Sequence, residues 1–194
     1  MNIQEEKRAL REKIRAKRLG IPVKMREHLS EKILAELSRE SFFHTDEFVF
    51  LYASMPEEVQ LYGLIRFMLD TGRKIAIPSI KGKGEMEAVE LSSGMDLKQD
   101  EFGLLTVAKD KRRIVPPEAI GLVIVPGVAF SEEGHRLGMG GGYYDNFLRD
   151  SAPHAYRAAL AFDVQLQDKI PTEKHDEKVD YIITESRSIA VKKG

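Results

Sequence analysis

A glycine-rich segment from residue 126 to 147 contains the residue types that bind phosphate. It reads PGVAFSEEGHRLGMGGGYYDNF and includes six of the chain's 15 glycines, four of them between Gly138 and Gly142. Glycine has no Cβ, so such a loop can bring backbone N–H groups close to an anion. Arg136 precedes the cluster by two residues, and a guanidinium can bind phosphate bidentately. The segment is a candidate phosphate site, although a plain turn also uses glycines.

The spacing differs from two common nucleotide-binding motifs. No Lys-Ser or Lys-Thr pair follows Gly142, as a Walker A loop requires, and the glycines do not form a good dinucleotide fingerprint. If a helix begins at Tyr143, its free N–H groups would add to the anion site. Tyr143 and Tyr144 are typical either of core or rim aromatics or of side chains that stack on a flat heterocycle.

An aspartate closes the segment. Asp145 follows the tyrosine pair, where a carboxylate beside bound phosphates can hold Mg²⁺ together with water. On position alone it is also typical of the first turn of a helix, where the dipole favours negative charge. The residues by themselves leave both interpretations open.

Basic charge is concentrated at the amino end. Residues 1–26 carry nine basic and three acidic side chains, a net charge of +6, whereas the whole chain carries −1. Lys7, Arg11 and Arg15 are spaced four apart and form a cationic ridge on a predicted helix. Such a ridge indicates either a solvated face or an anionic partner.

The composition excludes several classes of protein. The chain has 194 residues, 42% hydrophobic and 31% charged, which is typical of one globular domain and leads us to expect a single domain over residues 1–194. It has no cysteine, so disulfide frameworks, thiolate metal sites and cysteine nucleophiles are excluded. No stretch has the length and apolarity of a signal peptide or a membrane span, which predicts a cytoplasmic protein without a membrane partner.

Periodicity predicts helices and strands that alternate. We expect one helix over residues 3–19 and another over residues 61–72. Between them, a helix is expected to begin at Pro22 and to bury Met25, Leu29, Ile33 and Leu37. Short apolar runs predict strands at residues 48–53, 74–78 (ending at Pro78), 86–91, 121–126, 156–162, 181–184 and 189–191. This alternation predicts an α/β three-layer sandwich with a largely parallel central sheet flanked by helices. Ligands then bind at the carboxyl ends of strands, in the loops after Ala53, Pro78, Pro126 and Phe162.

Four blocks of the sequence are similar to those of one enzyme family. The string VPGVAFSEEGHRLGMGGGYYDNFL resembles the signature of the 5-formyltetrahydrofolate cyclo-ligases, in which VPG-x-x-F leads into RLG-x-G-x-GYYD. KRALREKIRAKR resembles the family's basic opening helix, YASMPEEV its folate-facing turn, and KIPTEKHDEKVDYIITE its closing segment. The blocks occur in the family's order.

The resemblance implies a ligase that uses ATP and Mg²⁺ to convert 5-formyltetrahydrofolate to 5,10-methenyltetrahydrofolate, with ADP and phosphate released. ATP would phosphorylate the formyl oxygen to an iminophosphate, and N10 of the folate would then displace phosphate. Such chemistry depends on positioning and phosphate electrostatics, with no protein nucleophile. The expected partners are these small molecules, without nucleic acid, and the expected state is a monomer.

The resemblance also implies site residues. Arg136 and Tyr144 would be catalytic, Asp145 and Asp176 would bind the metal, and Tyr144 would also contact folate. The folate would be bound by Ala53, Met55 and Glu58. The nucleotide would be bound by Lys7, Arg8, Ala9, Leu10, Arg11, Arg136, Leu137, Gly138, Met139, Gly140, Gly141, Gly142, Tyr143 and Tyr144. Lys13, Lys17 and Arg18 keep the solvated-face interpretation.

Two other functions fit parts of the sequence. A phosphosugar or acyl-transfer enzyme on a similar α/β sheet can also use a glycine loop, because a fold does not determine a function. A nucleic-acid-binding module would use the basic helix, and its affinity would fall with added salt.

Overall fold

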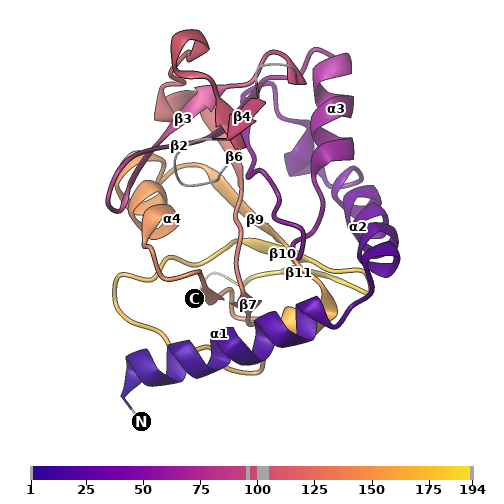
Figure 1. Cartoon of the computed structure of the whole chain (residues 1–194), viewed down its shortest axis with the longest axis vertical. Coiled ribbons are helices and arrows are strands. Elements are labelled where there is room, and N and C mark those ends of the chain that lie inside the picture. Colours follow the sequence, from indigo (N-terminus) through magenta and orange to yellow (C-terminus); the bar gives the residue numbers. More distant parts are fainter. Residues whose placement is uncertain (1, 95–96, 100–104, 193–194) are drawn as a thin grey trace.

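A seven-stranded sheet forms the centre of the molecule, with strand order β11-β10-β9-β6-β1-β2-β3 (Figure 1). The computed structural model describes residues 2–94, 97–99 and 105–192. The strands of this sheet are β1 (Phe48–Phe50), β2 (Ile75–Gly82), β3 (Glu85–Glu90), β6 (Ile120–Ile124), β9 (Tyr156–Leu160), β10 (Tyr181–Ile183) and β11 (Ser188–Ala190). The five inner strands are parallel and each edge strand is antiparallel to its neighbour. The largely parallel α/β sheet is therefore confirmed.

Helices cover both faces of this sheet. Helices α2 (Val23–Leu37) and α3 (Tyr62–Asp70) pack on one face through Ile33, Leu64 and Met68. The short α4 (Tyr143–Asn146) and the π-helical turn Phe147–Ser151 pack on the other through Phe147 and Leu148. Figure 1 shows the two sets on opposite sides of the strands. Successive strand residues face opposite sides, as the pleat dictates, so Val49 and Phe50 belong to different apolar clusters.

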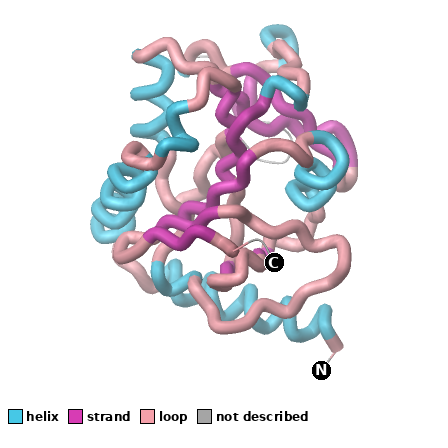
Figure 2. The backbone as a smooth tube through the Cα atoms, turned by 180° about the vertical axis from the view of Figure 1, so that it is seen from behind, coloured by secondary structure: helices cyan, strands magenta, loops and turns pink. Residues whose placement is uncertain are grey.

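Helix α1 (Ile3–Leu19) lies apart from these layers, along one end of the molecule (Figures 1 and 2). Asn2 and Glu5 form a capping box at its start, and it ends at Gly20 as the sequence predicts. Ile14 is fully buried and packs against Val128, Ala129 and Leu137. This contact fastens α1 to the segment that follows β6.

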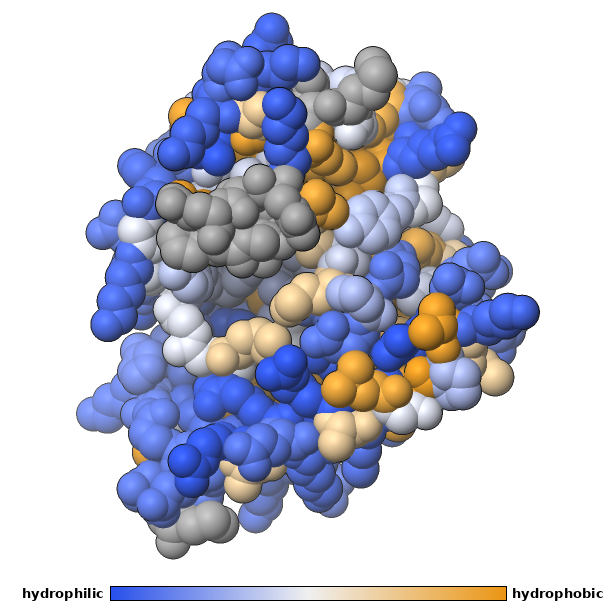
Figure 3. Space-filling model, in the orientation of Figure 1, coloured by the Kyte–Doolittle hydropathy of each residue, from blue (hydrophilic) through white to orange (hydrophobic). Residues whose placement is uncertain are grey.

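Smaller elements complete the chain. Two-stranded sheets pair β4 (Leu97–Gln99) with β5 (Leu105–Val107) and β7 (Ala129–Phe130) with β8 (Arg136–Leu137). Short 3₁₀ turns lie at Ser41–His44, Lys109–Lys111, Pro117–Ala119 and Asp163–Gln165. Within the described residues, no helix is both long and apolar enough to cross a membrane. The face in Figure 3 is mainly hydrophilic, with apolar residues interspersed.

Two strand boundaries differ from the prediction. The strand predicted over 48–53 ends at Phe50, because the chain leaves the sheet there to enter an irregular loop. The strand predicted to end at Pro78 continues to Gly82 and pairs Pro78 with Ala88 of β3. Pro78 lies beyond the end of β1, so on that side no neighbouring strand requires its missing N–H.

The burial of one residue in α2 and one in α1 also differs from the prediction. Met25 is 48% exposed, not buried, because the first turns of α2 direct Arg26 and Ser30 inward instead. Arg18 is only 1% exposed, so its solvated-face prediction is wrong, whereas Lys13 and Lys17 are exposed as expected. The Arg18 guanidinium lies 3.7 Å from Glu57 Oε1, which partly compensates the cost of burying a charge.

Candidate active site

A cavity of about 390 Å³ opens beyond the ends of β1 and β6 and beside the second half of β2. Tyr52 and Ala53 follow β1 in its wall, Pro78 belongs to β2, and Pro126 and Gly127 follow β6. This is the position that a parallel sheet predicts for a ligand, at the carboxyl ends of its strands. Helix α1 and the glycine-rich segment close the cavity from outside the sheet.

The glycine-rich segment forms one wall with backbone that other residues adopt poorly. Gly140 and Gly142 have φ angles of 103° and 71°, in the left-handed region. A Cβ on Gly138 would lie 2.8 Å from Arg136 Nη1, and one on Gly141 would lie 2.7 Å from the Tyr143 ring. The segment therefore needs glycines both for its path and for the close approach of neighbouring side chains.

Arg136 and Asp145 form an ion pair at the base of this wall. Arg136 Nη2 donates to Asp145 Oδ1 at 2.6 Å, and its Nη1 donates to the Pro126 carbonyl at 3.3 Å. Asp145 Oδ1 also accepts the Glu177 N–H at 3.0 Å. The Arg136 side chain is 3% exposed, and within the described structure its Nε has no hydrogen-bond partner. A buried guanidinium with an unused donor is suited to hold a further anion.

Helix α1 contributes cations from the opposite side. Lys7 Nζ lies 2.9 Å from Glu173 and 2.5 Å from Asp176, and the residue is 5% exposed. Burial opposes the charge of Lys7, but its two carboxylate partners outweigh this and raise its pKa. Arg11 Nε donates to the Gly138 carbonyl at 2.8 Å, which ties α1 to the glycine loop.

A carboxylate and imidazole cluster surrounds Lys7. Donor atoms of Glu173, His175 and Asp176 all lie within 4.8 Å of one another. Burial tends to raise the pKa of Asp176, but Lys7 and the Glu173 N–H lower it, so this carboxyl is held in its charged form. The oxygen ligands of Asp176 and Glu173 are of the type that Mg²⁺ prefers.

Another part of the cavity lining combines an aromatic, an apolar and an acidic side chain, Tyr144, Met55 and Glu58. The Tyr144 ring stacks on Phe50 with centroids 6.1 Å apart, and its hydroxyl is buried without a hydrogen-bond partner in the described structure. Burial, with the nearby charge of Glu58, raises the pKa of Tyr144, so its hydroxyl stays protonated. Glu58 Oε2 accepts the Met55 N–H at 2.9 Å, and burial raises the pKa of this carboxyl. Acceptor, donor and apolar surface thus lie along one wall.

A profile of the 5-formyltetrahydrofolate cyclo-ligase family matches residues 3–185. The chain belongs to this family. It is 26% identical over 195 residues to the 5-formyltetrahydrofolate cyclo-ligase of Mus musculus, covering 95% of this chain and 96% of that protein. It is 28% identical over 190 residues to the enzyme of Mycolicibacterium smegmatis, covering 94% and 95%.

Solved structures support the same family. The NMR structure of 5,10-methenyltetrahydrofolate synthetase from Aquifex aeolicus superposes with a TM-score of 0.85 at 31% identity, over 97% of this chain and 94% of that one. The synthetase from Mycoplasma pneumoniae, at 22% identity and a TM-score of 0.74, shows the same fold over 92% of this chain and 98% of that one. The identification of an enzyme of the cyclo-ligase family from its sequence motifs is therefore confirmed.

Most of the residues predicted from the family resemblance line this one cavity. They are Lys7, Arg11, Ala53, Met55, Glu58, Arg136, Leu137, Gly138, Met139, Gly140, Gly141, Gly142, Tyr143, Tyr144, Asp145 and Asp176. Three predicted residues of α1 lie elsewhere: Arg8 and Ala9 are exposed, and Leu10 packs beside Ile14. The loop after Phe162 does not contribute to the lining.

Several lining residues were not predicted from the sequence. Gln4, Tyr52, Asn146, Glu173 and His175 also line the cavity. Gln4 lies one helical turn before Lys7, and Glu173 lies three residues before Asp176, so local spacing was a usable signal for both. Asn146 was recognisable only from the fold, because its Nδ2 donates to the Gly84 carbonyl of the β2–β3 turn at 2.9 Å.

Proposed function

We propose that this chain converts 5-formyltetrahydrofolate to 5,10-methenyltetrahydrofolate with consumption of ATP. One observation carries the proposal: in a member of this family, a single cavity is lined both by the cationic, glycine-rich residues and by Met55, Glu58 and Tyr144. The first wall suits phosphate, through Arg136, Lys7 and Arg11. The second suits a pterin, through Glu58 and Tyr144.

In the reaction, the nucleotide bound at the first wall transfers a phosphoryl group to the folate bound at the second. The formyl oxygen is a poor leaving group, so transfer of the ATP γ-phosphoryl group to it forms an iminophosphate and ADP. The lone pair of N10 then attacks the formyl carbon, the bond from carbon to the phosphorylated oxygen breaks, and N10 loses its proton. The formyl oxygen leaves as part of inorganic phosphate. The protein's task is to position both substrates and to balance phosphate charge.

Each residue has a role that its surroundings support. Arg136, fixed by Asp145, offers its free Nε to the transferred phosphoryl group, where positive charge stabilises developing negative charge. The backbone from Gly138 to Gly142 surrounds the phosphates, and Lys7 and Arg11 neutralise them from α1. Tyr144, with its hydroxyl protonated, donates to the folate at the boundary between the two ligands.

The donor set fits Mg²⁺. Asp145 and Asp176 are carboxylates on the phosphate side of the cavity, and Glu173 provides a third close to Asp176. In the structure, Asp145 forms an ion pair with Arg136, and Asp176 forms one with Lys7. A bound Mg²⁺ would supply charge neutralisation between phosphate oxygens, and these carboxylates are the groups that would hold it.

The folate side is built from the loop after β1. Glu58 accepts hydrogen bonds from the donor edge of the pterin, and Met55 packs on its flat face. Ala53 and Met55 both line the cavity, and the hydrogen bond from Met55 N to Glu58 stabilises the turn that contains Met55.

The test is turnover by the purified chain, which we expect to act as a monomeric single domain. With 5-formyltetrahydrofolate, ATP and Mg²⁺, the absorbance of the methenyl product should rise, with one ADP released per product. A folded protein that forms neither product nor ADP would refute the proposal. Binding of a sugar phosphate without binding of ATP would favour a phosphosugar enzyme instead.

A further inference from the structure

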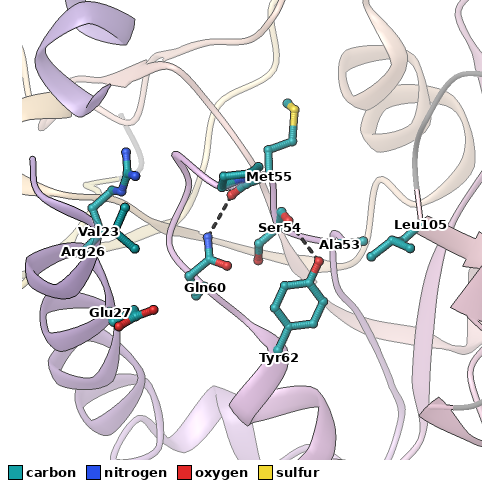
Figure 4. Close-up of a pocket in the computed structure, with 10 residues that line it drawn as sticks. Val23, Arg26, Glu27, Ala53, Ser54, Met55, Gln60, Tyr62 and Leu105 are labelled. Atoms are coloured by element: carbon teal, nitrogen blue, oxygen red, sulfur yellow. Dashed lines mark hydrogen bonds between the residues drawn. The ribbon is translucent and has the colours of Figure 1, made fainter. Parts of the chain in front are cut away.

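A second cavity of about 410 Å³ adjoins the one described above. It lies between the start of α2 and the loop from Ser54 to Tyr62 (Figure 4). Ala53, Met55 and Leu105 line both cavities. Since three residues are shared, a long ligand in the first cavity has a neighbouring space into which it can extend.

One wall of the second cavity carries a buried cation. Arg26 lines the cavity and is only 7% exposed. Its Nε has no hydrogen-bond partner in the described structure, and its Nη1 makes a single long hydrogen bond, 3.4 Å, to the Arg18 carbonyl. A buried guanidinium with unused donors is costly unless an acceptor completes it. A carboxylate matches its planar donor fork.

The start of α2 adds to the positive potential at the same place. Val23, Arg26 and Glu27 line the cavity from the first turns of this 15-residue helix, and Pro22 provides no side-chain cap. The first-turn N–H groups of a helix have no acceptor within the helix, and the helix dipole makes this end positive. Two independent features, the buried Arg26 whose Nε lacks an acceptor in the described structure and the uncapped helix end, thus favour an anion.

The facing wall is held in place by its own hydrogen bonds. Gln60 Nε2 donates to the carbonyls of Met55 and Glu58, each at 2.8 Å, and Tyr62 donates to the Ser54 carbonyl at 3.2 Å. In Figure 4 the Met55 side chain extends away from Gln60 and Tyr62 while its carbonyl faces Gln60. Met55 therefore lies between the two cavities and contributes to the lining of both.

We infer that this second cavity binds the carboxylate-bearing glutamyl tail of the folate substrate, with Arg26 as its anion-binding residue. The inference rests on the proposed function, because it places the pterin of the same molecule beside Glu58. The shared residues Ala53, Met55 and Leu105 mark the passage between pterin and tail. Glu27, an exposed carboxylate in the same lining, weakens the attraction at the rim.

The experiment compares two substrates that differ only in the tail. 5-Formyltetrahydrofolate carries the glutamyl group and 5-formyltetrahydropteroate lacks it, so kcat/KM is measured for both with the wild-type chain and with Arg26→Gln. Wild type should prefer the folate by about tenfold or more, since charge-assisted hydrogen bonds are the strong ones. Arg26→Gln should lose most of that preference through a higher KM for the folate, with little change for the pteroate.

Matched variants keep the test decisive. Lys24→Gln removes a positive charge from the same helix outside the cavity lining and should retain the wild-type preference. Glu27→Gln removes the opposing charge and should increase the preference, which tests the inference even if Arg26→Gln does not fold. Thermal unfolding of each variant reports on folding.

The outcomes separate this inference from the proposed function. Equal kcat/KM for the two substrates in the wild type, an unchanged preference in Arg26→Gln, or an equal loss for both substrates would overturn the tail site. If Arg26→Gln does not fold, an unchanged preference in Glu27→Gln overturns it. Failure of the wild type to turn over either substrate would instead refute the proposed function.

Discussion

Replacing Arg136 by glutamine should affect activity far more than folding. The change removes the guanidinium that donates to Asp145 at 2.6 Å and to the Pro126 carbonyl at 3.3 Å. It also removes the free Nε that we assign to the transferred phosphoryl group. Glutamine preserves a polar side chain, so the buried position is not left apolar.

The two effects have different expected sizes. Breaking a fully buried ion pair from one side costs about 3–5 kcal/mol. Asp145 is 16% exposed and keeps the Glu177 N–H, so we expect about 2–3 kcal/mol, or a Tm lower by about 4–12 °C. Loss of one donor that stabilises charge in the transition state lowers kcat by about 10²–10³.

Steady-state kinetics and calorimetry measure the two effects separately. The paired variant Asp145→Asn and the double variant complete a double-mutant cycle, in which the coupling free energy reports the ion pair itself. A folded Arg136→Gln protein with wild-type kcat would show that this arginine does not act on the phosphoryl group. A loss of kcat that follows the loss of folded protein would contradict the catalytic role in the same way.

Further variants test the other walls of the cavity. Lys7→Met should weaken ATP binding about tenfold or more in a calorimetric titration, because it removes a charged donor, and unchanged affinity would exclude Lys7 from the nucleotide site. Gly140→Ala should raise the KM for ATP and lower the free energy of unfolding by about 1–2 kcal/mol, because φ is 103° at this position. The control Gly63→Ala, at an exposed position of α3 with free space around it, should be neutral or stabilising. Equal effects of the two substitutions would contradict the strained loop. Because burial raises the pKa of Glu58, the KM for folate should rise as the pH falls through a value above the ordinary glutamate range, as protonation removes an acceptor. Glu58→Gln should abolish this pH dependence, and a pH profile identical to wild type would remove Glu58 from the folate site.

The local patterns of the sequence predicted the architecture better than the buried faces. Apolar runs located the strands, and β6 is buried on both sides as a continuous run predicts. The face of α2 was misassigned because Met25 and Arg26 are adjacent, and hydrophobicity alone favours the methionine. In the folded chain Arg26 is buried and Met25 is exposed, because Arg26 can reach the Arg18 carbonyl of α1.

The site, like the fold, could be predicted only in part from local sequence patterns. The glycine segment was recognisable because left-handed backbone and close packing leave a clear mark in the sequence. The association of α1 with this segment was implied only by the family resemblance, because Arg11 and Gly138 are 127 residues apart. The pairing of Lys7 with Glu173 and Asp176 is likewise set by the fold, and no local pattern encodes it.

The path of the formyl oxygen tests the central claim most directly. If ATP activates the formyl group in this cavity, 5-formyltetrahydrofolate labelled with ¹⁸O in the formyl group should give methenyl product, ADP and inorganic phosphate that contains the label. Mass spectrometry of the phosphate measures this. Formation of the methenyl product with the label in water and none in phosphate would contradict the account.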